Sequence, residues 1–104
     1  MGGGSREVVW TQAALGCMDE ILGYIAEESP GAAEHVLEAI DSMAESLSEL
    51  SERGRVVPEI GDPSIREVFV FRYRMLYQVG DDQVRVLGVI HGAMDFAARF
   101  RPGK

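Results

Sequence analysis

The hydrophobic periodicity of this chain changes near its middle. In the first half, apolar residues recur every three or four positions, which is the spacing of one face of a helix. In the second half, short runs rich in valine and aromatic residues are separated by clusters of glycine and aspartate, a pattern typical of strands joined by turns. Helices with one apolar stripe and strands with one apolar face bury both by packing together, which predicts a two-layer α+β domain.

The first half predicts a strand followed by two helices. Residues 6–10 end in Val-Val-Trp and form the expected strand, and the apolar stripe predicts a helix over 12–29. Ser29 and Pro30 end this helix and begin the next, because a residue before proline disfavours the helical conformation while proline is tolerated in a first turn. The second helix is expected to end at Gly54. With so short a connection, the helices should be antiparallel neighbours.

The second half predicts three or four consecutive strands. A short strand at 56–57 precedes a turn, and strands at 65–71 and 73–79 are separated by little more than Arg72. The last strand, 84–91, is apolar on both faces, which predicts a position inside the sheet. The expected fold is therefore an N-terminal strand and an antiparallel helical hairpin packed on a mostly antiparallel sheet of four to five strands.

Length and charge restrict what the chain can do. Its 104 residues suffice for one small domain, expected over residues 6–104, because residues 1–5 (MGGGS) are typical of a flexible linker added to a natural chain. The net charge of −7 disfavours general nucleic-acid binding, which requires a basic surface. The basic residues are arginines except for Lys104, and arginine is suited to fixed pairing with carboxylates or phosphates.

Cysteine usage and hydropathy indicate a cytoplasmic protein that contacts no membrane. Cys17 is the only cysteine, so the chain forms no internal disulfide, which fits a reducing compartment. No apolar run approaches the roughly 20 residues that cross a bilayer, and no signal peptide is apparent. Neither metal-ligand spacing nor a phosphate-binding glycine loop is present, so we expect no metal and no cofactor.

Three stretches of the second half match a known pattern. They are GRVVPE at 54–59, IREVFV at 65–70 continuing into YRMLY at 73–77, and VLGVIHGA at 86–93. In order and spacing they resemble the RelE/ParE superfamily, the toxins of bacterial type II toxin–antitoxin systems, and the resemblance covers nearly the whole chain. It implies the fold expected above, a cognate antitoxin similar to ParD as partner, and a hetero-oligomer with that antitoxin.

The ending VIHGA is more similar to the ParE branch, whose members bind DNA gyrase and trap its cleaved complex with DNA. The resemblance then implies an inhibitor of gyrase with no catalytic activity of its own, acting through a protein-binding surface. Candidate contacts with the target are charged or aromatic residues of the sheet and the C-terminal tail: Arg66, Arg72, Arg74, Phe96, Arg99, Phe100 and Arg101.

The resemblance also implies where the antitoxin binds. The C-terminal segment of the antitoxin is expected to fold onto the helical hairpin and its border with the sheet. Ala32, Ala33 and Val36 are candidates to line a groove there. The alternative for each is an ordinary place in the apolar stripe of the second helix.

The RelE branch offers an alternative function. Its members are ribosome-dependent mRNA endonucleases, and the resemblance carries a general base, a phosphate clamp and a general acid onto Glu59, Arg74 and His91. This alternative predicts that the three side chains converge on one face. A structural interpretation instead pairs Glu59 with Arg55 or Arg66 and places Arg66, Glu67 and Arg74 in a cross-strand charge ladder. The acidic composition and the glycine after His91, where an aromatic could stack on a base, both disfavour RNA cleavage.

One position departs from the pattern. Many members of the superfamily continue the last motif as His-Gly-Ala-Arg-Asp, and Met94 stands here in place of that arginine. If the arginine matters for toxicity, the chain is a weakened toxin that mainly titrates antitoxin, which is a third hypothesis.

Overall fold

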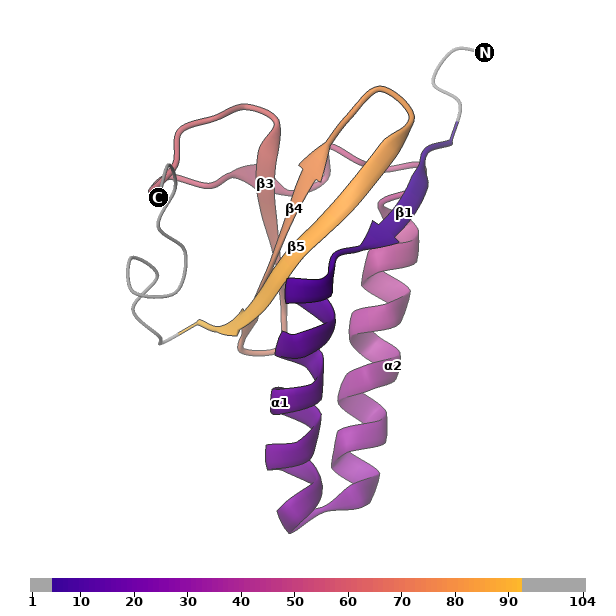
Figure 1. The fold of residues 1–104 in the computed structure, drawn as a ribbon, viewed down its shortest axis with the longest axis vertical. Coiled ribbons are helices and arrows are strands. Elements are labelled where there is room, and N and C mark those ends of the chain that lie inside the picture. Colours follow the sequence, from indigo (N-terminus) through magenta and orange to yellow (C-terminus); the bar gives the residue numbers. More distant parts are fainter. Residues whose placement is uncertain (1–4, 93–104) are drawn as a thin grey trace.

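Two long helices lie against one face of a curved sheet and extend beyond its end (Figure 1). The computed structural model describes residues 5–92. The elements in chain order are β1 (Glu7–Trp10), α1 (Gln12–Glu28), α2 (Pro30–Ser46), β2 (Arg55–Val56), β3 (Ile65–Val70), β4 (Tyr73–Val79) and β5 (Gln83–His91). The predicted α+β fold is confirmed. Within the described residues, no helix is long and apolar enough to cross a membrane.

The helices begin where hydroxyl side chains can satisfy their first backbone N–H groups. The Thr11 hydroxyl accepts a hydrogen bond from the Ala14 N–H at 3.1 Å and donates one to the Val86 carbonyl at 2.8 Å, so it also ties α1 to β5. Ser29 has an extended backbone and accepts from the Ala32 N–H at 3.1 Å. Because this single residue separates the helices, they are antiparallel neighbours as predicted.

The second helix is shorter than predicted. It ends at Ser46, and residues 47–53 form turns instead of continuing to Gly54. The Ser46 hydroxyl accepts a hydrogen bond from the Arg53 guanidinium at 2.8 Å, which folds this segment back on the helix end, and Leu47 is fully buried beneath it. Of the two periodic leucines that predict a longer helix, Leu47 joins the core from the turn, whereas Leu50 is exposed.

Gly54 has a different role from the helix cap expected of it. Its N–H donates to the Tyr77 hydroxyl at 3.0 Å. A β-carbon at this position would lie inside the contact distance of the Glu67 carbonyl oxygen and of the Tyr77 hydroxyl. The glycine is therefore needed for the close approach of the chain to β3 and β4.

The sheet has the strand order β1-β5-β4-β3-β2. β5 lies between β1 and β4, which confirms its predicted interior position. β1 is parallel to β5, with Glu7 opposite Gln83, and the other neighbours are antiparallel. Phe71 and Arg72 alone form the turn between β3 and β4.

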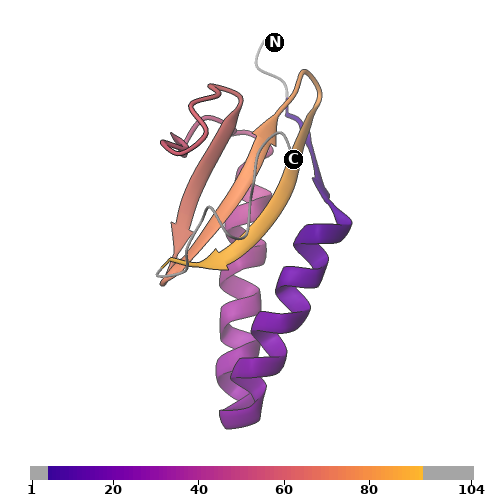
Figure 2. The ribbon, with the colours of Figure 1, turned by 60° about the vertical axis from the view of Figure 1, so that its left-hand side comes forward.

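Successive strand residues point to opposite sides of the sheet, and the two sides differ. The side packed on the helices, here called the inner face, belongs to a core of Ala14, Met18, Ile40, Ala44, Leu47, Val68, Val70, Met75, Tyr77, Val84, Val86 and Val89. The other side, the outer face, has a smaller buried cluster of Val57, Leu76 and Ile90. Figure 2 shows both helices on the inner side.

Candidate functional site

On the outer face, one buried arginine is held by two carboxylates. Arg74 of β4 is 7% exposed and Glu67 of β3 is 1% exposed. The Arg74 Nε donates to Glu67 Oε1 at 2.8 Å, and its Nη2 contacts the same oxygen. Arg74 also bonds both oxygens of Glu59, at 3.1 and 3.3 Å, and Arg55 Nε donates to the second oxygen of Glu67 at 2.6 Å. These four residues are called the Arg74 network.

The network balances two positive and two negative charges, of which Arg74 and Glu67 are buried whereas Arg55 and Glu59 are partly exposed. Buried charges are tolerated when they are paired and hydrogen-bonded, and no buried side-chain nitrogen or oxygen in residues 5–92 lacks a partner. The hydrogen bond from Arg74 holds the pKa of Glu59 below its ordinary value, and the same bond raises the pKa of Arg74. Arg74 is therefore a fixed charge already neutralised within the protein.

This geometry corrects two predictions. Arg74 does not lie on an exposed edge, because Glu59 and Glu67 enclose it. The ion pair of Glu59 is made with Arg74 and not with Arg55 or Arg66. Glu67, the centre of the network, is not among the predicted functional residues, but its ion pair with Arg74 matches the charge ladder of the structural interpretation.

His91 lies on the inner face, away from the network. It is paired with Tyr73 across β4 and β5, and the two rings meet edge to face with centroids 5.7 Å apart. Tyr73 and Arg74 are successive residues of one strand, so their side chains point to opposite faces. Glu59 and Arg74 are thus in contact, whereas His91 is separated from them by the sheet, and the three side chains do not converge.

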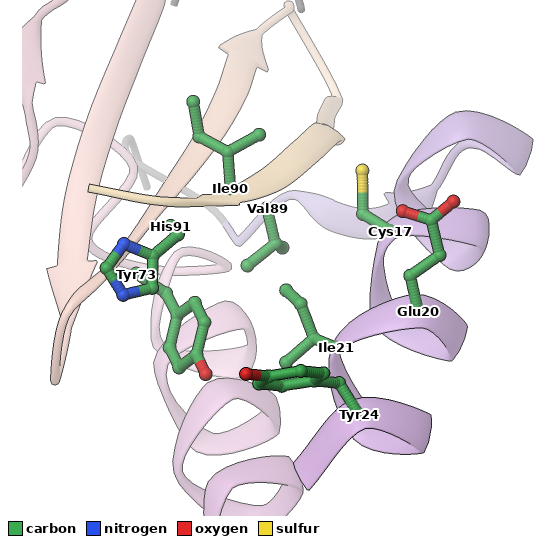
Figure 3. Close-up of a pocket in the computed structure, with 8 residues that line it drawn as sticks. All are labelled: Cys17, Glu20, Ile21, Tyr24, Tyr73, Val89, Ile90 and His91. Carbon is green, nitrogen blue, oxygen red and sulfur yellow. The ribbon is translucent and has the colours of Figure 1, made fainter. Parts of the chain in front are cut away.

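A cavity of about 430 Å³ opens beside His91, between α1 and the ends of β4 and β5 (Figure 3). Its lining is apolar with a few polar groups: Cys17, Glu20, Ile21 and Tyr24 of α1, and Tyr73, Val89, Ile90 and His91 of the strands. Tyr24 is 74% exposed, an unusual state for an aromatic residue next to a cavity. Such a hollow suits an apolar side chain presented by a partner.

The sequence prediction did not include this cavity. The signal that could have found it is Tyr24, an aromatic residue outside the apolar stripe of its helix. Figure 3 shows Tyr24 and Tyr73 on either side of the space between helix and sheet. Which strand end faces α1 depends on the sheet order, and periodicity alone does not provide that order.

The other predicted target contacts are dispersed. Arg66 is half-buried and donates to the Gly54 carbonyl at 2.8 Å, whereas Arg72 is exposed in the turn between β3 and β4. The remaining candidates, with the departure at position 94, lie outside the described residues: Met94, Phe96, Arg99, Phe100 and Arg101.

The predicted antitoxin contacts on α2 differ in their exposure to solvent. Ala32 is exposed, Ala33 is buried, and Val36 packs partly buried against the core. Ala33 and Val36 therefore match the alternative of an ordinary core stripe. Nowhere in residues 5–92 are three or more histidine, cysteine or acidic side chains grouped so that they could hold a metal ion.

The fold is similar to that of chains in two solved structures of toxin–antitoxin systems. The chromosomal ParDE system from P. aeruginosa matches with a TM-score of 0.68 at 18% identity, over 84% of this chain and 96% of that one. The toxin–antitoxin complex RelBE2 from Mycobacterium tuberculosis matches with a TM-score of 0.56 at 22% identity, over 84% and 98%. At these identities the likeness shows the fold alone.

Sequence comparison shows the family. The family described as the ParE toxin of the type II toxin–antitoxin system parDE matches residues 8–96. Toxin RelE2 of Caulobacter vibrioides is 35% identical over 88 residues, which cover 84% of this chain and 96% of that protein. The chain therefore belongs to the ParE toxin family, within the RelE/ParE superfamily of type II toxin–antitoxin toxins, as its motifs predicted.

Proposed function

We propose that this toxin acts in the cytoplasm by binding DNA gyrase, with no catalytic activity of its own. The observation that carries the proposal is the Arg74 network. An RNA-cleaving site needs a cation that can hold the scissile phosphate, together with a base and an acid on the same side of it. Arg74 is already paired with Glu59 and Glu67, and His91 lies on the other face. The match to the ParE family and the net charge of −7 support the same reading.

A second candidate function is the ribosome-dependent cleavage of mRNA. It is favoured by the 35% identity to a relative that carries the name RelE2. In this case Glu59, Arg74 and His91 would be the reacting groups, and they would have to come together from opposite faces of the sheet. The candidate therefore predicts a large rearrangement on the ribosome.

The test adds the purified chain to gyrase in supercoiling and cleavage assays with plasmid DNA. We expect cleaved complex to accumulate, and a ParD-like antitoxin to prevent it. Intact gyrase activity, together with codon-specific mRNA cuts on programmed ribosomes that His91→Ala abolishes, would contradict the proposal. Silence in both assays, with antitoxin still bound, would indicate a weakened toxin, and Met94→Arg should then restore activity.

We propose further that a ParD-like antitoxin forms a hetero-oligomer with this chain and covers the cavity between α1 and the sheet. An amphipathic segment placed there would bury Tyr24 and Ile21 of the helix against the strand wall of the cavity. Exposed aromatic residues are frequent centres of binding energy in such interfaces. This position agrees with the predicted border of hairpin and sheet, although α1 provides the lining in place of α2.

Cys17 makes the antitoxin proposal testable, because it lines the cavity and is the only thiol in the chain. We expect antitoxin to slow its reaction with a thiol reagent. Tyr24→Ala should weaken antitoxin binding by about tenfold or more. Leu50→Ala is the matched control, since Leu50 is 56% exposed and lies outside the cavity. An unchanged rate at Cys17 in the saturated complex would rule the cavity out as the binding site.

A further inference from the structure

The turn between β3 and β4 holds a large side chain in an unfavourable backbone conformation. Phe71 has φ of +56°, the one positive value among the non-glycine residues that the structure describes. In this region the β-carbon of an L-residue crowds its own backbone, so glycine, asparagine or aspartate is the usual choice in two-residue hairpin turns. A phenylalanine here therefore has an unfavourable backbone conformation, which the surrounding structure must hold in place.

Packing does not explain the phenylalanine. Phe71 is 57% exposed, and its ring meets the exposed His35 of α2 with centroids 5.5 Å apart. Most of the ring thus faces solvent, where an apolar side chain gains little. Strained residues of this kind gather at sites of function, and loops on a rigid scaffold are where such sites occur.

Neighbouring residues extend Phe71 into a patch. Phe69 is 50% exposed, and the Arg55 guanidinium lies 5.9 Å from the centre of its ring. Arg72 is exposed, and its carbonyl accepts a hydrogen bond from the Gly92 N–H at 2.7 Å, which fastens the turn to the end of β5. Arg55, Phe69, Phe71 and Arg72 are called the hairpin patch.

Because Arg55 is paired with Glu67, Arg72 supplies the positive charge of the hairpin patch on an otherwise acidic protein. The helices α1 and α2 contain eight carboxylates and neither lysine nor arginine: Asp19, Glu20, Glu27, Glu28, Glu34, Glu38, Asp41 and Glu45. Residues 68–80 contain no carboxylate and two arginines, of which Arg74 is buried and neutralised by Glu59 and Glu67, whereas Arg72 is exposed in the turn. An acidic partner is thus repelled by the helices and attracted to the turn, so the charges orient its approach.

We propose that the hairpin patch is the surface through which this toxin contacts its protein target, and that it fits an acidic region of that target into which Phe71 inserts. The inference rests on the proposed function, which makes gyrase the partner. Aromatic and arginine side chains dominate the energetic centres of protein interfaces. Tyr73 of the cavity directly follows Arg72 of the turn, so an antitoxin placed in the cavity would lie close to the turn that carries Phe71 and Arg72.

Phe71→Asn separates binding from folding. Asparagine tolerates a positive φ, so the variant should melt at the same temperature as the wild type or higher. We expect it to require at least about tenfold more toxin for half-inhibition of gyrase supercoiling. If Phe71 only stabilised the fold, the melting temperature would fall and activity would decline in parallel, which would overturn the proposal.

Arg72→Glu tests the charge of the partner. We expect a loss of inhibition of about tenfold or more, and a weakening of wild-type inhibition as salt increases. Arg85→Glu is the matched control, because Arg85 is an exposed arginine in the half of β5 that lies farther from the turn between β3 and β4. If the position of the charge matters, Arg85→Glu should change the inhibition of gyrase by less than about twofold. Equal losses in the two variants would contradict a localised patch.

The same titrations distinguish the two proposals. A wild-type chain that leaves gyrase untouched overturns the proposed function and the patch together. A wild-type chain that inhibits gyrase, while Phe71→Asn and Arg72→Glu inhibit it equally well, overturns the patch alone. Loss of antitoxin affinity in Phe71→Asn with full inhibition of gyrase would make the patch an antitoxin surface, which also overturns this inference.

Discussion

The two faces of the sheet are built by different means. The inner face is an apolar core shared with both helices, whereas the outer face combines a small apolar cluster with the Arg74 network. Apolar burial stabilises in proportion to area and tolerates changes of shape. A buried ion network stabilises little in net terms, yet it becomes costly when one partner is removed. The requirement for stability therefore explains the apolar inner face, but it gives no reason for buried charges on the outer face.

The network has a visible structural result. Arg74 holds Glu59, and so fixes the loop between β2 and β3 against the sheet, while Arg55 connects Glu67 to the ring of Phe69. The outer face thus positions the side chains that lead to the hairpin patch. The four predictions below test whether this division of roles between the faces is correct.

Arg74→Met should have the largest effect. It leaves Glu67 buried with only Arg55 as an ionic partner, and breaking a buried pair destabilises by about 3 kcal/mol or more. Urea denaturation measures the loss. The double variant Glu67→Leu with Arg74→Met should recover most of it, because well-packed apolar residues replace buried ion pairs at little cost. A single-variant loss below about 1 kcal/mol would show that the network is not buried in solution.

Met75→Ala tests the inner face on the same strand. Met75 is fully buried, and truncation of such a side chain costs about 2 to 3 kcal/mol through lost contacts and a cavity. Met75→Leu should cost less than about 1 kcal/mol, because it conserves volume. The inner face should therefore tolerate a conservative substitution. On the outer face, Arg74→Lys should still destabilise, because lysine cannot replace the planar set of donors of the guanidinium.

Gly54→Ala should destabilise by about 1 to 2 kcal/mol, because the new methyl group meets the Glu67 carbonyl and the Tyr77 hydroxyl. Gly16→Ala is the control in the same chain. Nothing lies near a β-carbon on Gly16 in the helix α1, so alanine should stabilise by about 0.5 to 1 kcal/mol. Thermal melts of the two variants should therefore shift in opposite directions, and a parallel shift would contradict the close approach at Gly54.

The smallest effect concerns Glu59 and pH. Its pKa is lowered by Arg74, so its contribution to stability is present above the ordinary glutamate pKa of about 4.3 and is lost as pH falls through the lower folded value. Because the side chain is 44% exposed, solvent screening limits the contribution to less than about 0.5 kcal/mol. The stability difference between wild type and Glu59→Gln should be largest near pH 7 and should shrink as pH falls below the ordinary glutamate pKa of about 4.3. If this difference in stability instead grew as pH fell, the lowered pKa of Glu59 would be contradicted.

Local patterns predicted most of the fold, and tertiary contacts account for what they missed. Ser29 and Pro30 fixed the helix connection, because both act on their own backbone. The end of α2 was misjudged because Gly54 serves a contact with Tyr77, which lies far along the chain. Phe71 was assigned to a strand, since aromatic residues favour strands, and its positive φ has no local signal.

The candidate site was predicted less completely for a related reason. Glu59 and Arg74 were both selected, but their contact and the central position of Glu67 depend on strand register and on how the loop after β2 folds back. His91 was grouped with them because sequence motifs carry no information about faces. A shift of one residue along a strand exchanges the inner and outer faces, which is why a correct set of residues did not give a correct arrangement.

The parallel pairing of β1 with β5 sets an order of events during synthesis. Among the elements of residues 5–92, β1 is translated first and its strand partner β5 last, since Glu7 aligns with Gln83 and Trp10 with Val86. The helical hairpin leaves the ribosome before the strands that cover its apolar stripe have been made. The five-stranded sheet is therefore completed only after β5 has been synthesised, when the apolar stripes of both helices have already left the ribosome.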